Sequence, residues 1–180
     1  MVIKRSFYQK PTLAVAKNLL GKYLVRELDG ERLAGKIVEV EAYCGPNDLA
    51  CHSSHGRTKR TEVMFGPAGH AYVYLIYGMY YCLNVVTGEN GAAVLIRALE
   101  LPNPSGSELS GPGKLCRFMK IDKSFNGWDL TKGEKLWVED RQEPAPKIAA
   151  APRIGVNYAR EYANKPWRFY IEETVRRVRP

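Results

Sequence analysis

The sequence predicts a mixed α+β domain built around a largely antiparallel sheet. Short segments rich in β-branched and aromatic residues, which favour strands, outnumber the segments with helical periodicity. The links between these segments are too short for the crossover connections that parallel strands require. With 180 residues, the chain is long enough to bury a core of its own, and we expect a single domain over residues 1–180.

The sequence of the first quarter of the chain predicts a short helix followed by a hairpin. Residues 11–20 carry an amphipathic apolar stripe and begin with a proline, which suits the first turn of a helix. Strands are predicted over 22–28 and 32–43. Asp29-Gly30, which lies between them, is a pair typical of tight hairpin turns.

A tyrosine-rich stretch follows in the middle of the chain. Five of the 11 tyrosines lie within residues 70–81, among valines, leucines and isoleucines that favour strands. Gly78 interrupts the apolar run, and it permits either a bulge in one long strand or a tight hairpin with Tyr77 at its tip. Another strand is predicted over 92–98. A core hairpin needs neither so many tyrosines nor the amide of Asn84, so the stretch indicates a binding site.

The elements predicted after residue 100 are short. In order, we expect a proline- and glycine-rich connection over 101–110, a helix from about 110 to 120, strands over 136–138 and 147–154, a short helix over 158–163, a strand over 167–171 and a basic tail over about 172–180.

Charge and composition narrow the classes of partner. The net charge of +8 favours a polyanion, with nucleic acid ahead of a membrane surface. The longest apolar run is too short for a membrane span of about 20 residues, and no signal-peptide core follows the first basic residues, so we expect a cytosolic chain without a membrane partner. Four cysteines without a Cys-x-x-Cys pair are expected to be reduced thiols. The cluster Cys44, Cys51, His52 and His55 has spacing unlike that of usual zinc sites.

Two glutamates on the predicted strand 32–43 are the candidates for chemistry. Glu41 precedes a Gly-Pro turn, where a carboxylate can act as a general base on water. A sheet-edge glutamate paired with a lysine is the alternative. Glu39 lies on the same face, roughly 6.5–7 Å away, and that separation resembles the carboxylate pair of an inverting glycosidase. Side chains on one strand lie parallel, however, which argues against a sugar held between them.

Two basic segments have open interpretations. The polar loop 53–61 carries Arg57, Lys59 and Arg60, and it is either a solvated loop or a phosphate-contacting loop beside a groove. The glycine-rich helix start that ends at Lys114 either binds a phosphate or simply begins a helix.

Six sequence motifs follow one another along the chain. They are Val40-Glu41-Ala42-Tyr43 with Gly45-Pro46, Asp48 and His52; Tyr72 to Tyr80 followed by Asn84; Val94 to Glu100; Ser110 to Cys116; Arg153 to Val156; and Lys165 to Tyr170. Together they resemble the alkyladenine (3-methyladenine) DNA glycosylase family over nearly the whole chain and in the family's order. A slightly shorter basic loop after His52, and Tyr81 in place of phenylalanine, depart from the family pattern and bear on loop contacts and lesion preference.

The resemblance implies a single-domain α+β fold with a curved, mainly antiparallel sheet, short helices and a protruding β-hairpin that inserts into DNA. It implies a monofunctional glycosylase, which flips a damaged purine out of double-stranded DNA and hydrolyses its N-glycosidic bond, starting base excision repair. The lesion class would include 3-methyladenine, 7-methylguanine, hypoxanthine and ethenoadenine. No metal or organic cofactor, and no strand cleavage, are expected. We expect a cytoplasmic, nucleoid-associated monomer. The alternative is a non-catalytic basic nucleic-acid-binding module.

The resemblance also implies a role for each matching residue. The roles are a general base that activates water (Glu41), an arginine that places this water and a backbone phosphate (Arg97), stacking on one face of the flipped base (Tyr43) and on the other (His52 and Tyr74), exclusion of normal guanine (Asn84), filling of the gap in the duplex (Tyr77), and DNA contacts (Met64 near the minor groove, and Lys114).

Overall fold

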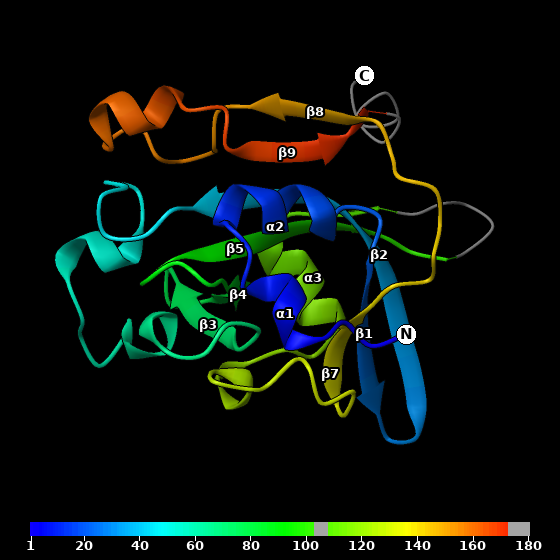
Figure 1. The fold of residues 1–180 in the computed structure, drawn as a ribbon. Coiled ribbons are helices and arrows are strands. Elements are labelled where there is room, and N and C mark those ends of the chain that lie inside the picture. Colours follow the sequence, from blue (N-terminus) through cyan, green and yellow to red (C-terminus); the bar gives the residue numbers. More distant parts are fainter. Residues whose placement is uncertain (103–107, 173–180) are drawn as a thin grey trace.

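The described residues, 1–102 and 108–172 of the computed structural model, form one curled antiparallel sheet with short helices packed against it (Figure 1). This confirms the predicted α+β class. The predicted basic tail beyond residue 172 lies outside the described residues. In spatial order the main strands are β3 (Ala71–Ile76), β4 (Tyr80–Val86), β5 (Ala93–Glu100), β2 (Glu31–Tyr43), β1 (Tyr23–Leu28) and β7 (Leu136–Glu139), while β6 (Glu108–Ser110) pairs with β5, and β9 (Arg168–Ile171) pairs with both β2 and β8 (Ile148–Ala151).

The long strand β2 organises this sheet. Along one edge it pairs with β5, from Lys36 to Tyr43. Along the other edge it pairs first with β1, over residues 31–36, and then with β9, over residues 39–41. The register with β5 shifts on both sides of Glu39, and such irregularities bend a strand and increase its twist. The C-terminal third of β2 is therefore enclosed by strands on both edges.

Three α-helices and four 3-10 helices accompany the sheet in the described residues. They are α1 (Arg5–Tyr8), α2 (Thr12–Leu19), α3 (Pro112–Phe118), η1 (His52–His55), η2 (Glu62–Phe65), η3 (Lys123–Phe125) and η4 (Arg160–Asn164). The apolar stripe of α2, with Val15, Ala16 and Leu19 all buried, packs on β2 and β5 (Figure 1). In the described ranges, no helix has the length and apolar character needed to cross a membrane.

The turn between β3 and β4 decides between the two interpretations of Gly78. Tyr77 and Gly78 both have positive φ, +52° and +66°, and the amide of Met79 donates to the carbonyl of Ile76 at 3.1 Å. Positive φ at two consecutive residues is the signature of a tight hairpin turn. Gly78 therefore lies in a hairpin turn and not in a bulge, and Tyr77 is 83% exposed at its tip. Insertion of this tip into DNA stays a prediction.

The short elements differ most from the prediction. Strand β6 falls at the end of the stretch expected as an irregular connection, and the strand expected over 147–154 ends at Ala151. The helix expected over 158–163 is the 3-10 helix η4, and α1 was not predicted. Elements of three to five residues lack a full period of hydrophobic pattern, so their partners in the fold determine them.

Candidate active site

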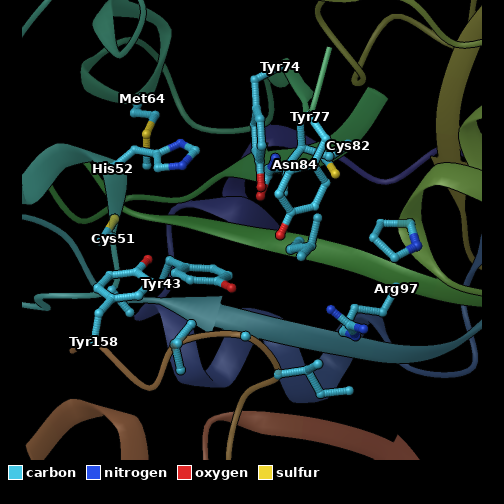
Figure 2. A pocket seen from close by; sticks show the side chains of 17 residues that line it. Tyr43, Cys51, His52, Met64, Tyr74, Tyr77, Cys82, Asn84, Arg97 and Tyr158 are labelled. Atoms are coloured by element: carbon cyan, nitrogen blue, oxygen red, sulfur yellow. The ribbon is translucent and has the colours of Figure 1, made fainter. Parts of the chain in front are cut away.

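A cavity of about 250 Å³ opens beside the C-terminal third of β2 (Figure 2). Its lining comes from segments far apart in the chain: the end of β2, the η1 and η2 region, both strands of the β3–β4 hairpin, β5, the start of α3 and the loop before η4. The predicted site residues among the lining are Tyr43, His52, Met64, Tyr74, Tyr77, Asn84 and Arg97. Sequence positions spread over more than 50 residues are thus brought to one cavity.

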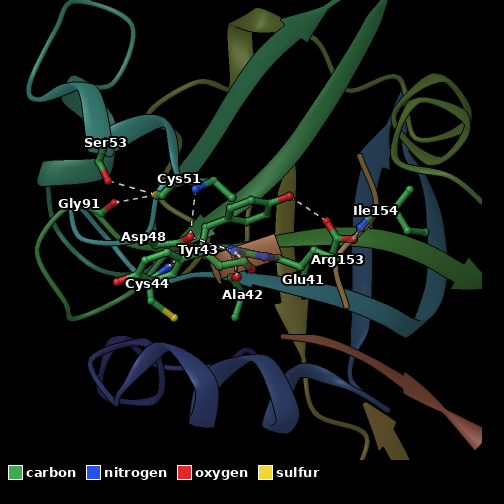
Figure 3. Close-up of polar contacts among 12 residues, drawn as sticks. Glu41, Ala42, Tyr43, Cys44, Asp48, Cys51, Ser53, Gly91, Arg153 and Ile154 are labelled. Carbon is green, nitrogen blue, oxygen red and sulfur yellow. Dashed lines mark hydrogen bonds and ion pairs between the residues drawn. The ribbon is translucent and has the colours of Figure 1, made fainter. Parts of the chain in front are cut away.

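Glu41 lies next to this cavity, and its side chain is fully buried. The hydroxyl of Tyr43 donates to Oε2 at 2.8 Å, and the backbone amide of Ile154 donates to Oε1 at 2.8 Å (Figure 3). The Nη1 atom of Arg97 lies 3.4 Å from Oε1. A buried carboxylate is tolerated only with such compensation. The alternative of a sheet-edge glutamate paired with a lysine is therefore wrong.

Arg97 bridges Glu39 and Glu41 of β2. Its Nε donates to Oε1 of Glu39 at 3.2 Å, and the same oxygen accepts from Nη1 of Arg168 at 3.1 Å. Glu39 therefore pairs with the guanidinium groups of both Arg97 and Arg168, and Arg97 also contacts Glu41. Carboxylates that bind the same arginine cannot flank a sugar from opposite sides, as an inverting glycosidase requires. The structure contradicts the carbohydrate interpretation.

Aromatic rings face one another across the cavity. The rings of His52 and Tyr74 meet edge to face with centroids 4.6 Å apart, and Tyr43 lies on the other side (Figure 2). Nδ1 of His52 is 2.9 Å from the hydroxyl of Tyr72, which is a buried residue of β3. The hydrogen bond fixes the imidazole plane. The gap between the rings has the form of a slot for a flat ligand.

The ionisable groups of the slot are neutral at physiological pH. Burial, and then the charge of Arg60, lowers the pKa of His52 to about 4. Burial, and then the charge of Glu41, raises the pKa of Tyr43 well above its ordinary value. Burial raises the pKa of Tyr74 as well. The imidazole and both phenols are therefore uncharged, and the guanidinium groups beside them are those of Arg60, 5.4 Å from the Tyr74 centroid, and Arg153, 4.8 Å from the Tyr43 centroid.

The remaining predicted residues lie in different surroundings. Asn84 is buried and lines the cavity, and its Nδ2 donates to the carbonyl of Tyr72 at 3.0 Å. Met64 was expected near a DNA groove, but it is 3% exposed and forms part of the cavity wall, because η2 packs against β3 and β4. Lys114 is exposed on α3 and does not line the cavity, so its DNA contact stays a prediction.

The basic loop lies beside the slot. Arg60 places its guanidinium 5.4 Å from the ring centroid of Tyr74, and Arg57 pairs with Glu62 at 2.7 Å. Lys59 is exposed. Across the described ranges, no group of three or more His, Cys, Asp or Glu side chains is arranged to hold a metal ion, so the cysteine–histidine cluster near residue 51 forms no such site.

A buried ion pair beneath the slot was missed by the sequence reasoning. Arg153 binds Asp48 through both terminal nitrogens, at 2.5 and 2.9 Å, and its neighbour Ile154 supplies the amide that binds Glu41. Asp48 and Arg153 both belong to sequence motifs of the chain, but they are 105 positions apart and no local pattern links them. Cys82 and the exposed Tyr158 also line the cavity without having been predicted.

Comparisons with known proteins identify the family of the chain. A family model described as Methylpurine-DNA glycosylase matches residues 6–175. A relative from Legionella pneumophila (strain Corby), provisionally named a 3-methyladenine DNA glycosylase, is 54% identical over 95% of this chain and 94% of its own. Relatives with the same provisional name occur in Methanocella arvoryzae (54% identical, covering 94% and 92%) and in Alkaliphilus oremlandii (48%, covering 96% and 96%). The chain therefore belongs to the methylpurine-DNA glycosylase family.

Proposed function

We propose that this protein is a monofunctional DNA glycosylase that removes damaged purines from double-stranded DNA by hydrolysis and so starts base excision repair. The observation that carries the proposal is the buried carboxylate of Glu41, which is fixed by two hydrogen bonds and an arginine beside a slot of neutral aromatic rings. Membership of the family and the names of the relatives support it. We propose that the protein acts as a cytoplasmic monomer on nucleoid DNA, for which its net charge of +8 is suited.

The slot suits a purine that has been flipped out of the stack. An enzyme cannot reach the N-glycosidic bond inside a duplex, and extrusion costs least for a damaged or mispaired base. The base would lie between Tyr43 and the His52–Tyr74 pair. Alkylation at N3 or N7 makes a purine cationic, and each aromatic face attracts a cation by about 0.5–2 kcal/mol. Because His52 is neutral, it does not repel such a base. Asn84 in the cavity wall would obstruct the exocyclic amino group of guanine.

In the proposed reaction, a water oxygen bonds to the sugar C1′ while Glu41 accepts the proton of that water. The bond from C1′ to the base nitrogen breaks, and its electron pair stays on the base, so that an alkylated cationic purine leaves as a neutral molecule. Positive charge grows on the sugar as this bond breaks, and the Glu41 carboxylate stabilises it. Arg97, at 3.4 Å from that carboxylate, would place the water and a backbone phosphate.

The tip of the β3–β4 hairpin would hold the DNA open. Tyr77 lines the mouth of the cavity and is almost fully exposed, so its ring can occupy the space of the extruded nucleotide. None of the described residues that line the cavity is a lysine. A Schiff base with the sugar would need such an amine, and we therefore propose simple hydrolysis without strand cleavage.

The test is release of free base from an alkylated duplex. We expect Glu41→Gln to lower the single-turnover rate by about 10²–10⁴-fold, because general-base catalysis contributes that much, while binding to the lesion duplex is retained. Glu143→Gln is the matched control: Glu143 also accepts a tyrosine hydroxyl, that of Tyr23 at 2.6 Å. Its partners Tyr23 and Lys36 do not line the cavity, whereas Glu41 contacts residues that do. Methylated, hypoxanthine and ethenoadenine duplexes would rank the lesions.

Two results would contradict the proposal. Full activity of Glu41→Gln would remove the assigned base. Salt-dependent DNA binding by the wild-type protein, with no free base and no abasic sites from any of the three duplexes, would identify a non-catalytic nucleic-acid-binding module instead.

A further inference from the structure

Arg153 is the most deeply buried arginine near the slot. Its side chain has no exposed surface, and that of its partner Asp48 is 1% exposed. The two groups meet in the forked geometry that a guanidinium and a carboxylate favour. Burial alone would lower the pKa of Arg153, but the hydrogen bond and charge of Asp48 raise it, so the guanidinium is charged.

The guanidinium also holds other parts of the backbone. Its Nη1 donates to the carbonyl of Ala42 at 2.9 Å, and its Nη2 donates to the carbonyl of Tyr162 at 3.2 Å. Asp48 accepts from the amides of Cys44 and Ala50, which fixes the turn that leads from β2 toward η1. One ion pair thus joins the end of β2 and that turn (Figure 3). Through the carbonyl of Tyr162 it also holds η4.

Two aromatic rings lie close to the guanidinium. Its carbon is 4.8 Å from the ring centroid of Tyr43 and 5.0 Å from that of Trp167. Its Nε, although buried, has no hydrogen-bond partner among the described residues. The guanidinium therefore makes four hydrogen bonds through its terminal nitrogens and also packs against the ring of Tyr43. A lysine would keep the charge but could neither stack in this way nor bind Asp48 through a fork.

Both reacting parts of the proposed site depend on these contacts. Ala42, whose carbonyl is held, lies between Glu41 and Tyr43 in β2. Ile154, which follows Arg153, donates its amide to Glu41 at 2.8 Å. A shift of the arginine would move the ring behind the flipped base and the amide on the carboxylate together. Misplacement of reacting groups by about 1 Å can cost about 10²-fold in rate.

We propose that Arg153, with Asp48, is a positioning residue that sets the Tyr43 ring and the Glu41 carboxylate relative to each other. This role rests on the proposed glycosylase function. It differs from a structural ion pair in one respect: its loss slows the chemical step of a protein that remains folded. The planar, stacked guanidinium is required for it, and positive charge alone is not sufficient.

The experiment compares Arg153→Lys and Asp48→Asn with the control Arg5→Lys. Arg5 pairs with Asp129 at 2.6 Å across 124 positions, but it does not line the cavity. Each protein is assayed at a temperature where circular dichroism shows it folded. Single-turnover base release from alkylated duplex is measured at saturating enzyme, and the Kd for the duplex is measured separately. We expect the rate to fall about 10- to 100-fold in Arg153→Lys and about tenfold in Asp48→Asn, with Kd changed less than about threefold. Arg5→Lys should stay within about twofold of the wild-type rate.

Three results would overturn the proposal. The first is a rate for Arg153→Lys within twofold of wild type. The second is an equal slowing of Arg5→Lys at an equal loss of thermal stability. The third is failure of both Arg153→Lys and Asp48→Asn to fold, which would show a purely structural pair; if only one fails, the other decides. A fourth result concerns the wild-type protein: if it releases no base, the proposed function is wrong, and the positioning role is wrong with it.

Discussion

The two hairpins of the sheet have similar turns but different residues at the tip. In the β1–β2 hairpin, Asp29 and Gly30 have φ of +50° and +83°. In the β3–β4 hairpin, Tyr77 and Gly78 have φ of +52° and +66°. The first turn closes directly between Leu28 and Glu31, whereas the second contains an additional residue, Met79, before the strands pair.

Only the first tip follows the local preference of the backbone. Aspartate tolerates the left-handed region because its short side chain can bond locally, but a bulky residue there costs about 1–2 kcal/mol. Tyr77 does not recover this cost by packing, because it is 83% exposed, and Met79 is 66% exposed. A strained and exposed aromatic residue at a tip indicates a contact with a partner. The comparison separates a turn that follows the preference of the backbone from a turn for which we propose a role in binding.

The largest expected effect is on activity. Tyr77→Ala should lower single-turnover base release from a lesion duplex by about 5- to 150-fold, since stacking of an aromatic ring on a base contributes about 1–3 kcal/mol. Asp29→Ala is the matched control at the other tip, and its rate should equal that of wild type. Equal rates for both variants would show that the two tips do not differ in function.

The second prediction is a gain in stability at the tip whose substitution lowers activity. Tyr77→Asn should raise the free energy of unfolding by about 1 kcal/mol, because asparagine favours the left-handed region, while activity stays as low as in Tyr77→Ala. Asp29→Asn should change stability by less than about 0.5 kcal/mol. Urea denaturation measures the unfolding free energy of both variants, provided that the m-value is unchanged. No gain in Tyr77→Asn would mean that the tyrosine is not strained.

The third prediction is a loss of stability of equal size when the glycine of either turn is replaced by alanine. A Cβ added at Gly30 or at Gly78 would meet no atom within 4 Å, so only the backbone conformation resists alanine at either position. Each substitution should cost about 1–2 kcal/mol of unfolding free energy. Base release should fall for Gly78→Ala alone, because that change tilts Tyr77. A much larger loss of stability in one variant would show hidden packing at that tip.

The smallest effect concerns pH. Since the pKa of His52 is about 4 in the folded protein, below its usual 6.5, the unfolded chain binds more protons between these values. The stability that His52 contributes is therefore complete above pH 6.5 and is lost as the pH falls toward 4. His52 contacts Tyr72 and Tyr74 of β3. Amide-exchange protection, corrected for intrinsic rates, should decline in β3 and β4 from pH 6.5 to 5.

The β1–β2 hairpin provides the reference for that measurement. Glu143 binds Tyr23 and Lys36 of this hairpin, and its hydrogen bond with Lys36, followed by that with Tyr23, lowers its pKa below the usual 4.5. Its contribution is therefore present above pH 4.5 and is lost only below it. Equal loss of protection in both hairpins between pH 6.5 and 5 would contradict the role of His52.

The sequence contained the local features of the fold. The Asp29-Gly30 turn and the amphipathic α2 follow from short-range pattern, and the structure confirms them. The Tyr77-Gly78 turn was one of two alternatives, because glycine is compatible with both a bulge and a hairpin. Most of the candidate site residues were predicted from the resemblance to a family.

Contacts between residues far apart in the chain could not be predicted from local sequence pattern. A glutamate in an alternating strand can be exposed or enclosed, and Glu41 is enclosed by contacts from Arg97 of β5 and from the amide of Ile154, which follows β8 in the chain. The Asp48–Arg153 pair has no local signature either. Met64 was placed at a DNA groove, yet its position in the cavity wall depends on how η2 packs against two strands.

The enclosure of β2 by β9 has a consequence for the order in which the molecule forms. The contact between Glu41 and Ile154 spans 113 positions, and that between Glu39 and Arg168 spans 129. Contacts of such separation close late, since a long loop must be ordered before they form. The sheet of β1 to β5 can assemble earlier from local hairpins, but its carboxylate is then without the Ile154 amide. We therefore expect the ability to hydrolyse to appear in the last step of folding, after the ability to hold DNA.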